Sequence, residues 1–239
     1  MLTGKVILVV GGAAGIGRAT AELCAARGAA VIVADRDAIA GAAVAAVVGG
    51  LFVPVDVTDA ASVQALMAAI AAKHGRLDAL IQAAGILKGA YTPVDEFPLE
   101  TWRAVLEVNV TGSFLCAKHA TPLLKKAGGG VIVLISSGAA VGGSSSVAYG
   151  ASKGGVNGLG ITLAQKLAPE GIRVNVVMPG NIDTGMKRSV IAAEAEKSGK
   201  PLEDAVAASR LGAPEGVAKI LAWLVSDDAD YVRGMISTR

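Results

Sequence analysis

The chain has 239 residues, of which 53% are hydrophobic and 18% are charged, and this balance excludes a disordered protein. A net charge of +2, without a Lys/Arg cluster on one predicted face, argues against nucleic acid as a partner. Gly, Pro or Ser residues interrupt the uncharged stretches 38–55 and 127–152, so we expect no membrane contact. The N-terminus runs into a strand-like segment rather than a secretory signal, and Cys24 and Cys116 stand alone. We therefore expect a cytoplasmic protein with reduced thiols and no metal site.

Short apolar runs alternate with segments of helical periodicity along the whole chain. The runs predict about seven parallel strands covered on both faces, at 5–10, 30–34, 51–55, 78–82, 130–135, 172–178 and 234–238. Apolar residues recur at helical spacing at Val63, Leu66, Met67 and Ile70, at Val156, Leu159, Leu163 and Leu167, and at Val217, Ile220, Leu221 and Leu224. This alternation predicts a doubly wound, Rossmann-like α/β sheet in a single domain over residues 1–239.

A polar, Ala-rich segment over 186–212 interrupts the alternation after the sixth strand. An insertion there lies at the carboxyl edge of the sheet, where ligands bind in open α/β folds. We predict that this segment is a substrate lid.

A glycine-rich turn joins the first strand to a helix and contains Gly11, Ala14, Gly15, Ile16 and Gly17. Glycines let a backbone approach a pyrophosphate, and the helix N-terminus offers free N–H groups and a positive dipole end. The turn therefore predicts a dinucleotide site. The alternative is a tight turn that uses glycine only for its backbone angles.

Acidic residues follow the next two strands. Asp35 is placed to accept hydrogen bonds from the adenosine ribose and to repel a 2′-phosphate, which favours NAD over NADP. Arg36 instead favours NADP, because its guanidinium can pair with that phosphate. Asp35 and Asp37 can each cap the next helix, and Asp37 is the better candidate. Asp56 either contacts adenine or caps the helix after it.

Tyr149 and Lys153 are four residues apart, so they share one face of a helix. A nearby ammonium lowers the pKa of a phenol, which suits the phenol to exchange a proton with an alcohol oxygen. Taken alone, the pair is more typical of a solvated helix face. Ser136 and Ser137 end an apolar strand, where a hydroxyl can bind a substrate oxygen. Asn109 lies mid-helix, where Asn is mildly unfavourable and so can be retained for a purpose.

Together these motifs resemble the short-chain dehydrogenase/reductase family in its short, single-domain form. The resemblance covers nearly the whole chain and rests on motifs in a specific order: 11–17, Asp56-Val57, Ala83-Ala84-Gly85, Asn109, Ser136-Ser137, Tyr149 to Lys153, and 179–184.

The resemblance implies an oxidoreductase that transfers hydride between NAD(H) and a secondary alcohol or ketone. Tyr149 would be the general acid/base, Lys153 would hold the nicotinamide ribose, Ser137 would orient the substrate oxygen, and Asn109 would hold a relay water. The remaining cofactor contacts would come from Arg36, Val57, Ala84, Gly85, Pro179, Gly180, Ile182 and Thr184. The resemblance also implies a homotetramer or dimer built through the helices that contain Asn109 and Tyr149.

The chain departs from the family pattern at four places. Val10 replaces the usual Thr before the first motif glycine, which removes a hydroxyl with a structural role. Gln82 and Ala83 replace the usual Asn pair, which puts a sheet-stabilising contact in doubt. The spacing between Ser137 and Tyr149 is one residue shorter than usual, so either Ser136 or Ser137 is the functional serine, and the strand-end pattern favours Ser137. The chain ends at Arg239, where the family usually continues with a tail that packs near the subunit interface.

Two other functions remain open. An NADP-dependent 3-oxoacyl-thioester reductase would act on an acyl chain held by an acidic carrier, for which Lys125-Lys126 is a weak signal. A catalytically silent nucleotide-binding relative would be expected to lose Tyr149 or Lys153. Small residues at Gly142, Gly143 and 144–146, with Met186 and Val190 as an apolar wall, indicate room for a bulky or cyclic substrate.

Overall fold

A computed structural model describes residues 1–238 and contains one seven-stranded parallel sheet. The strands are β1 Val6–Val10, β2 Ala30–Asp35, β3 Leu51–Pro54, β4 Ala79–Gln82, β5 Gly130–Ile135, β6 Ile172–Met178 and β7 Gly234–Ser237. Each differs from its predicted range by at most one residue at either end. The order β3-β2-β1-β4-β5-β6-β7 confirms the doubly wound topology.

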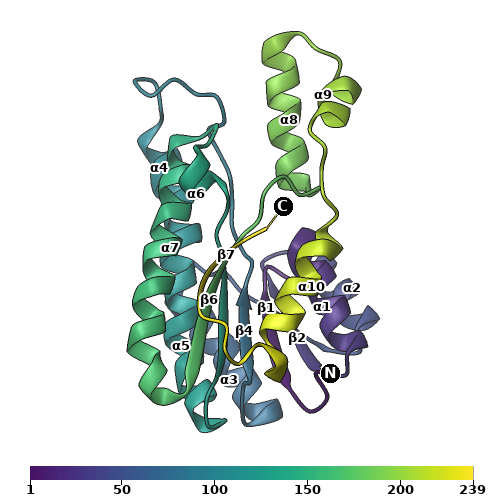
Figure 1. Cartoon of the computed structure of the whole chain (residues 1–239), viewed down its shortest axis with the longest axis vertical. Helices are drawn as coiled ribbons and strands as arrows, with labels where there is room; N and C mark the ends of the chain where they lie inside the picture. The colour runs from purple at the N-terminus through teal and green to yellow at the C-terminus, as the bar shows by residue number, and fades with distance from the viewer. Residues whose placement is uncertain (239) are drawn as a thin grey trace.

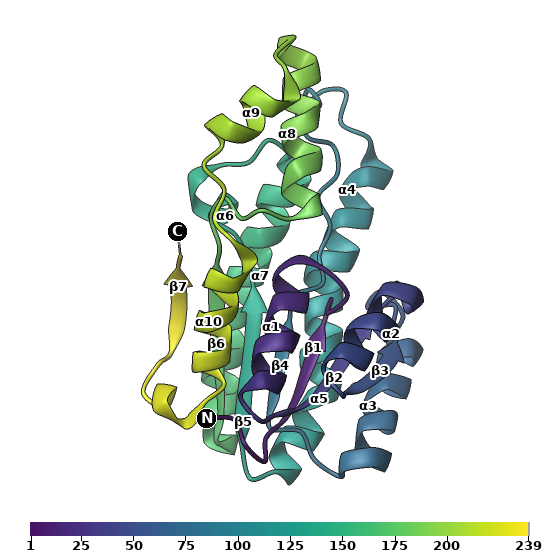
Figure 2. The same cartoon turned by 90° about the vertical axis from the view of Figure 1, so that its right-hand side faces the viewer.

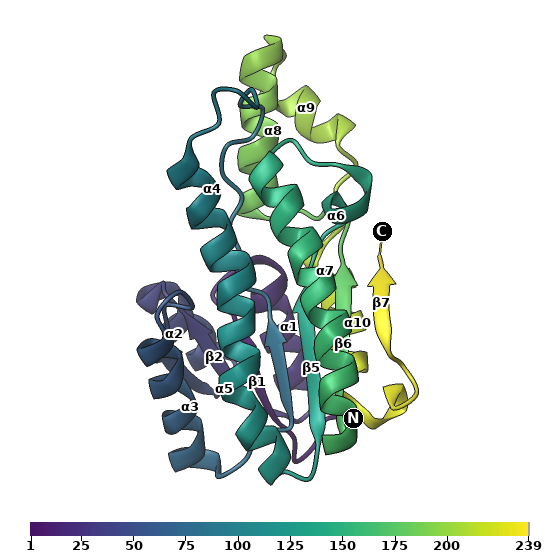
Figure 3. The same ribbon diagram turned by 90° about the vertical axis from the view of Figure 1, so that its left-hand side faces the viewer.

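Helices lie on both faces of this sheet, as Figures 1 and 3 show. The helices are α1 Gly15–Ala26, α2 Ala38–Val47, α3 Ala60–His74, α4 Leu99–Leu106, α5 Gly112–Lys126, α6 Ala139–Gly142, α7 Val147–Leu167, α8 Gly185–Ser198, α9 Leu202–Ala208 and α10 Pro214–Leu224. Short 3-10 turns follow at η2 Ala168–Glu170 and η3 Asp227–Ala229, and a π-helical segment, η1 Glu107–Thr111, joins α4 to α5. In Figure 1, α4, α5 and α7 lie on one side of the sheet and α1, α2 and α10 lie on the other.

Two apolar cores follow from this layering, because alternate residues of each strand point to opposite faces. One core packs β-strand residues such as Leu8, Leu80 and Ile132 against α3, α5 and α7. The other packs Ile7 and Ile81 against α1, α2 and α10. The residues predicted from helical spacing on α3 are all buried, which confirms that face.

Both cysteines are buried and unpaired, and burial raises the pKa of each thiol to about 12. Neither is therefore a nucleophile at neutral pH. Among residues 1–238, no helix is long and apolar enough to cross a bilayer. That range also brings together no group of three or more His, Cys, Asp or Glu side chains able to hold a metal ion.

The predicted lid segment forms α8 and α9, which stand above the carboxyl edge of the sheet (Figure 2). A single parallel bridge between Ile182 and Gly212 closes its base. At its outer part, the Tyr91 hydroxyl donates a hydrogen bond of 2.9 Å to Glu194 on α8. Tyr91 has a φ of +59°, which is uncommon for an aromatic residue, and its N–H donates to the Ser145 carbonyl at 2.7 Å. The segment therefore contacts the loop that leads to α4, and that loop in turn contacts the loop that leads to α7.

Candidate active site

A cavity of about 660 Å³ opens at the carboxyl ends of the strands, where the chain reverses between β1 and β4. Ligands bind at such a switch point in open α/β sheets. Every residue predicted for the cofactor or the catalytic group lines this cavity except Asn109: Gly11, Ala14, Gly15, Ile16, Gly17, Asp35, Arg36, Asp56, Val57, Ala84, Gly85, Ser137, Tyr149, Lys153, Pro179, Gly180, Ile182 and Thr184. Residues that are far apart in the chain thus share one hollow.

The glycine turn forms a narrow cradle at one end of the cavity. A Cβ at Gly17 would lie 2.0 Å from the Gly11 carbonyl oxygen, and one at Gly11 would lie 2.4 Å from the Ala84 nitrogen. Helix α1 starts after Ala14 without a side-chain cap, so its first N–H groups remain available. The cradle therefore fits the diphosphate of a dinucleotide, and only glycine fits at these two positions.

Acidic side chains mark the far end of the same cavity. Asp35 is held by two backbone donors, the Ala13 N–H at 3.0 Å and the Asp37 N–H at 3.1 Å. Asp37 caps α2 by accepting from the Ala40 N–H, which confirms it as the better cap. The alternative that Asp56 caps α3 is wrong, because Asp59 accepts from the Ala61 N–H.

Asp56 instead accepts hydrogen bonds from both the N–H and the hydroxyl of Thr58. These bonds hold the pKa of its carboxyl below the ordinary value, and the Arg36 charge adds a smaller lowering. Arg36 and Asp56 therefore attract each other electrostatically at this end of the cavity. The carboxylate of Asp56 stays ionised at neutral pH.

At the other end, the first turns of α7 bring Tyr149 and Lys153 into the cavity. Ser146 caps this helix by accepting from the Tyr149 N–H, and its own hydroxyl donates to the Lys88 carbonyl at 2.6 Å. The Lys153 ammonium donates to the Ile135 carbonyl at 2.8 Å and lies 5.6 Å from the centre of the Tyr149 ring. The β5 end and the α7 start are thereby joined directly beneath the phenol.

The two neighbouring serines have different surroundings. The Ser136 hydroxyl is buried and donates to the Lys153 carbonyl at 2.9 Å, which holds β5 against α7. Ser137 is half-buried, lines the cavity and lies close enough to Tyr149 to influence its pKa. Both serines line the cavity, but the Ser136 hydroxyl is already bonded to Lys153, so the Ser137 hydroxyl is the freer of the two beside Tyr149.

The expected lowering of the Tyr149 pKa by Lys153 is wrong for this structure. Burial raises the pKa of Tyr149. A hydrogen bond with the Ser137 side chain lowers that pKa, but by less than burial raises it. Burial also lowers the pKa of Lys153 to about 8, since its ammonium is removed from water with only a carbonyl as partner. At neutral pH Tyr149 is therefore a neutral phenol, a form suited to donate a proton.

Asn109 lies behind the cavity, in η1, where the Gly112 N–H reaches back five residues to the Glu107 carbonyl. Its side-chain amide exchanges two hydrogen bonds with the backbone of Ile86, at 2.8 and 2.9 Å, and donates to Ser152 at 2.9 Å. A Cβ at Gly85 would lie 3.2 Å from the Asn109 Oδ1 atom and 3.3 Å from the Lys153 Nζ atom. Asn109 thus fixes the chain that follows β4 against α7.

Comparisons with known proteins identify the family of this chain. A sequence profile described as enoyl-(acyl carrier protein) reductase matches residues 11–238. The cis-4-hydroxycyclohexanecarboxylate dehydrogenase of Sinomonas cyclohexanicum is 43% identical over 241 residues, covering 97% of this chain and 93% of its own length. The chain belongs to the short-chain dehydrogenase/reductase family.

Other members of the short-chain dehydrogenase/reductase family support this assignment. The 3-oxoacyl-(acyl-carrier-protein) reductase FabG of Thermotoga maritima is 36% identical, covering 98% of this chain and 96% of its own. In the crystal structure of levodione reductase, 30% identical, the match covers 98% of this chain and 96% of the other with a TM-score of 0.89. The fold and the oxidoreductase class acting on CH–OH groups follow from these matches.

The sequence did not single out several residues of this short-chain dehydrogenase/reductase site. The Ile135 carbonyl and Ser152 hold Lys153 and Asn109, but a backbone carbonyl and a helical serine carry no motif. Lys187, on the first turn of α8, lines the cavity next to the predicted Met186. Gln82 is 1% exposed and, within the described residues, neither of its amide atoms has a partner, consistent with the expected loss of a sheet contact.

Proposed function

We propose that this protein is an NAD(H)-dependent dehydrogenase of secondary alcohols and the corresponding ketones, with Tyr149 as the acid/base. The observation that carries the proposal is that a single cavity contains both the glycine cradle and the Tyr149–Ser137 pair. A cofactor held in the cradle and a substrate held at the phenol would therefore meet inside one site. The catalytically silent alternative would leave Tyr149 and Lys153 in that cavity without a role.

The chain's own residues would hold the cofactor along the cavity floor. The cradle at Gly11 and Gly17 would take the diphosphate, Asp35 would take the adenosine ribose, and Thr184 would lie near the nicotinamide. When bound there, the nicotinamide supplies the hydride for reduction or accepts it in oxidation. Thr184 caps α8 by accepting from the Lys187 N–H at 3.2 Å, so its position is fixed by the helix start.

The proton would move at the Tyr149 hydroxyl. In reduction the neutral phenol would donate its proton to the ketone oxygen, and in oxidation the phenolate would accept the proton of the alcohol. Ser137 would donate to the same substrate oxygen and hold it beside the phenol. Lys153 would restore the charge balance, since a pKa of about 8 lets it exchange a proton near neutral pH. Asn109 would position the chain around Lys153. It would also hold a water molecule that relays protons to Lys153.

Asp35 supports NAD over NADP. Its carboxylate is fixed by two backbone N–H groups, so it has little freedom to move away from an entering 2′-phosphate. Arg36 is exposed and is partly engaged by the charge of Asp56. The fixed carboxylate of Asp35 should therefore affect the choice of cofactor more than the exposed guanidinium of Arg36 does.

We further propose that the alcohol is carried on a ring. A relative at 43% identity is named for a hydroxycyclohexanecarboxylate, and a structural neighbour is titled levodione reductase. The turn at Gly142, Gly143 and Ser144 lines the cavity with small side chains, which leaves width above Tyr149. Residues 186–212 would close over this substrate as a lid.

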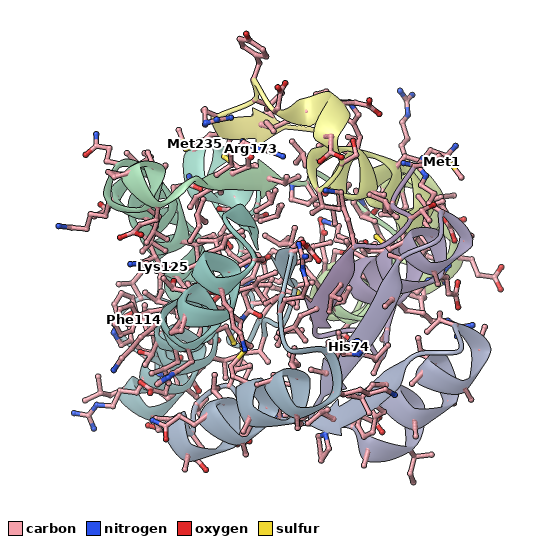
Figure 4. The ribbon with its side chains drawn as sticks, turned by 90° about the horizontal axis from the view of Figure 1, so that it is seen from below. Met1, His74, Phe114, Lys125, Arg173 and Met235 are labelled. Carbon is pink, nitrogen blue, oxygen red and sulfur yellow. The ribbon has the colours of Figure 1, made fainter. Side chains whose placement is uncertain are left out.

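Assembly as a homodimer or homotetramer is part of the same proposal. Phe114 on α5 is 44% exposed, and Ile161 on α7 is 43% exposed on the same layer. In the view from the edge opposite α8 (Figure 4), Phe114 lies on the outer side of that layer and Met235 lies at the β7 end of the sheet. Large apolar side chains on the outside of α5 and α7 would be covered in an oligomer. A cytoplasmic location remains a prediction.

A second candidate is an NADP-dependent 3-oxoacyl-thioester reductase. The profile description, the 36% identity to FabG and the cavity position of Arg36 favour it. It would require Arg36, rather than Asp35, to decide the cofactor.

Titration of NADH and NADPH against the wild type, Asp35→Asn and Asp35→Ala tests the proposal. Asp35→Asn removes the charge but keeps an oxygen for the Ala13 N–H, whereas Asp35→Ala removes both. Asp37→Asn, outside the cavity, is the matched control. We expect the wild type to bind NADH at least tenfold more tightly, and Asp35→Asn to lose that preference by gaining NADPH affinity. Equal or tighter NADPH binding by the wild type would contradict the proposal and favour the second candidate.

A further inference from the structure

Lys187 is the least expected charged residue of the cavity wall. It lies on the first turn of α8, is half-buried, and lines the cavity together with Met186 and Val190 of the same helix. The Thr184 cap fixes the start of this helix. The cation thus projects from an otherwise apolar wall whose position is set by the end of β6.

The Lys187 ammonium has no hydrogen-bond or ion-pair partner within residues 1–238. Its neighbour Arg188 shows that an acid is within reach of this turn, since Arg188 pairs with Asp183 through two bonds of 2.5 and 2.7 Å. Arg188 and Asp183 line a separate, neighbouring cavity that does not include Lys187. Asp183 therefore pairs with Arg188 at the neighbouring cavity and does not pair with Lys187.

The other charges of the main cavity leave Lys187 without a counter-ion. Its acidic lining residues, Asp35 and Asp56, lie at the adenosine end, after β2 and β3. Lys153, the other lysine of the wall, is buried and donates to a backbone carbonyl. A half-buried ammonium beside apolar side chains attracts an anionic group, because a charge-assisted hydrogen bond is stronger there than in water.

We infer that Lys187 binds a carboxylate of the substrate, so that the substrate class is a cyclic hydroxy acid and its keto acid. The ring would pack between the Met186 and Val190 side chains and the turn at Gly142 to Ser144, with the alcohol at Tyr149 and the carboxylate at Lys187. This inference rests on the proposed function for the alcohol end of the substrate. It assigns to the lid a role in selecting charge as well as excluding water.

An anion near Lys187 can have a second source, the diphosphate of the cofactor. Thr184 lies against the glycine cradle, since a Cβ at Gly15 would be 3.1 Å from the Thr184 methyl group. The start of α8 is therefore close to the diphosphate position. The shared chemistry is an oxyanion, and the experiment must separate the two sources.

The test compares Lys187→Met, Lys187→Arg and the matched control Lys200→Met, which changes an exposed lysine beyond the end of the same helix. Calorimetry measures the binding of cyclohexanecarboxylate and of the neutral cyclohexanecarboxamide to each enzyme in the presence of saturating NADH. These probes lack a hydroxyl, so binding is read without turnover. NADH affinity is measured separately by fluorescence, and oxidation of 4-hydroxycyclohexanecarboxylate is followed with NAD⁺.

We expect the wild type to prefer the carboxylate over the amide by about tenfold, the low end for a charged hydrogen bond at a half-buried site. Lys187→Met should lose this preference with unchanged NADH affinity, Lys187→Arg should recover most of it, and Lys200→Met should behave as the wild type. Absence of the preference in the wild type, or its survival in Lys187→Met, would overturn the inference. A loss of NADH affinity in Lys187→Met with carboxylate binding unchanged would overturn it too, in favour of the diphosphate. Lys187-dependent carboxylate binding without oxidation of any ring alcohol would instead contradict only the proposed function.

Discussion

Replacing Lys153 by methionine should stabilise the cofactor-free protein while abolishing its activity. Lys153 is 4% exposed and its ammonium has one hydrogen-bond acceptor, the Ile135 carbonyl. Methionine has a similar length, fills the same space and carries no charge to bury. The variant therefore isolates the free energy that the fold gives up to keep a charged amine at this position.

The magnitude follows from the pKa of Lys153. Burial lowers that pKa from 10.5 to about 8, a difference of about 2.5 units, or about 3 kcal/mol. Because the folded-state pKa is the lower one, the unfolded chain binds more protons between pH 8 and 10.5, and stability rises with pH across that window. The full free-energy cost of burying the charged Lys153 is thus present below pH 8. The lost bond to the Ile135 carbonyl offsets about 1 kcal/mol, so Lys153→Met should be about 2 kcal/mol more stable at pH 7.

Urea unfolding followed by tryptophan fluorescence, at pH 7 and at about pH 10, measures this difference. The advantage of Lys153→Met should fall to within about 1 kcal/mol at the higher pH. At about pH 10 the wild-type lysine is already neutral in the folded state, and only the small remaining difference from its unfolded-state pKa of 10.5 still costs stability. Lys166→Met, an exposed lysine on the same helix, should show no comparable pH-dependent difference. A Lys153→Met protein that is less stable than the wild type by the same amount at both pH values would refute the reasoning.

Four further substitutions have defined outcomes. Tyr149→Phe should lower kcat by about 10²–10⁴-fold, as expected for a lost acid/base, with NADH affinity within about twofold by fluorescence titration; near-normal turnover would contradict the assignment. Gly17→Ala should lower both the thermal midpoint and NADH affinity, because its Cβ would lie 2.0 Å from the Gly11 carbonyl oxygen, whereas Gly216→Ala, on α10 with no atom within 4 Å, should gain about 0.5–1 kcal/mol in urea unfolding. Tyr91→Phe removes only a hydroxyl bond to the exposed Glu194 and should cost less than about 1 kcal/mol in the same assay; a larger loss would mean that this bond is more protected from water than its exposure suggests.

The central strands could be predicted closely because most of their residues are buried on both faces. β1, Val6–Val10, and β5, Gly130–Ile135, are nearly continuous apolar runs, a pattern typical of parallel strands. The glycines of the cradle could be predicted for a related reason. Each marks a place where the backbone passes too close to another for a Cβ, and a helix follows at once.

Other parts of the site depend on contacts that leave no local pattern. The effect of Lys153 on Tyr149 was predicted from their spacing alone, but the spacing does not reveal that burial acts on both groups. The Ile135 carbonyl, which accepts from Lys153, belongs to a strand 18 residues away. Lys187 was missed because only the apolar residues Met186 and Val190 mark this wall in the sequence, and a single lysine between them carries no motif.

The π-helical segment η1 puts α4 and α5 out of phase. Its i→i+5 bond from Gly112 to Glu107 accommodates one residue more than an α-helical turn would. Removing one residue between Asn109 and Gly112 would let the two helices merge into a regular helix, at the expense of turning the part on one side of the deletion by about 100° relative to the other. Either the buried face of α5, which includes Cys116 and Ala120, or the Asn109 side chain would then leave its partners. The extra residue thus rotates α5 relative to α4. This rotation lets α5 pack against the sheet while Asn109 keeps its hydrogen bonds to the loop at Ile86.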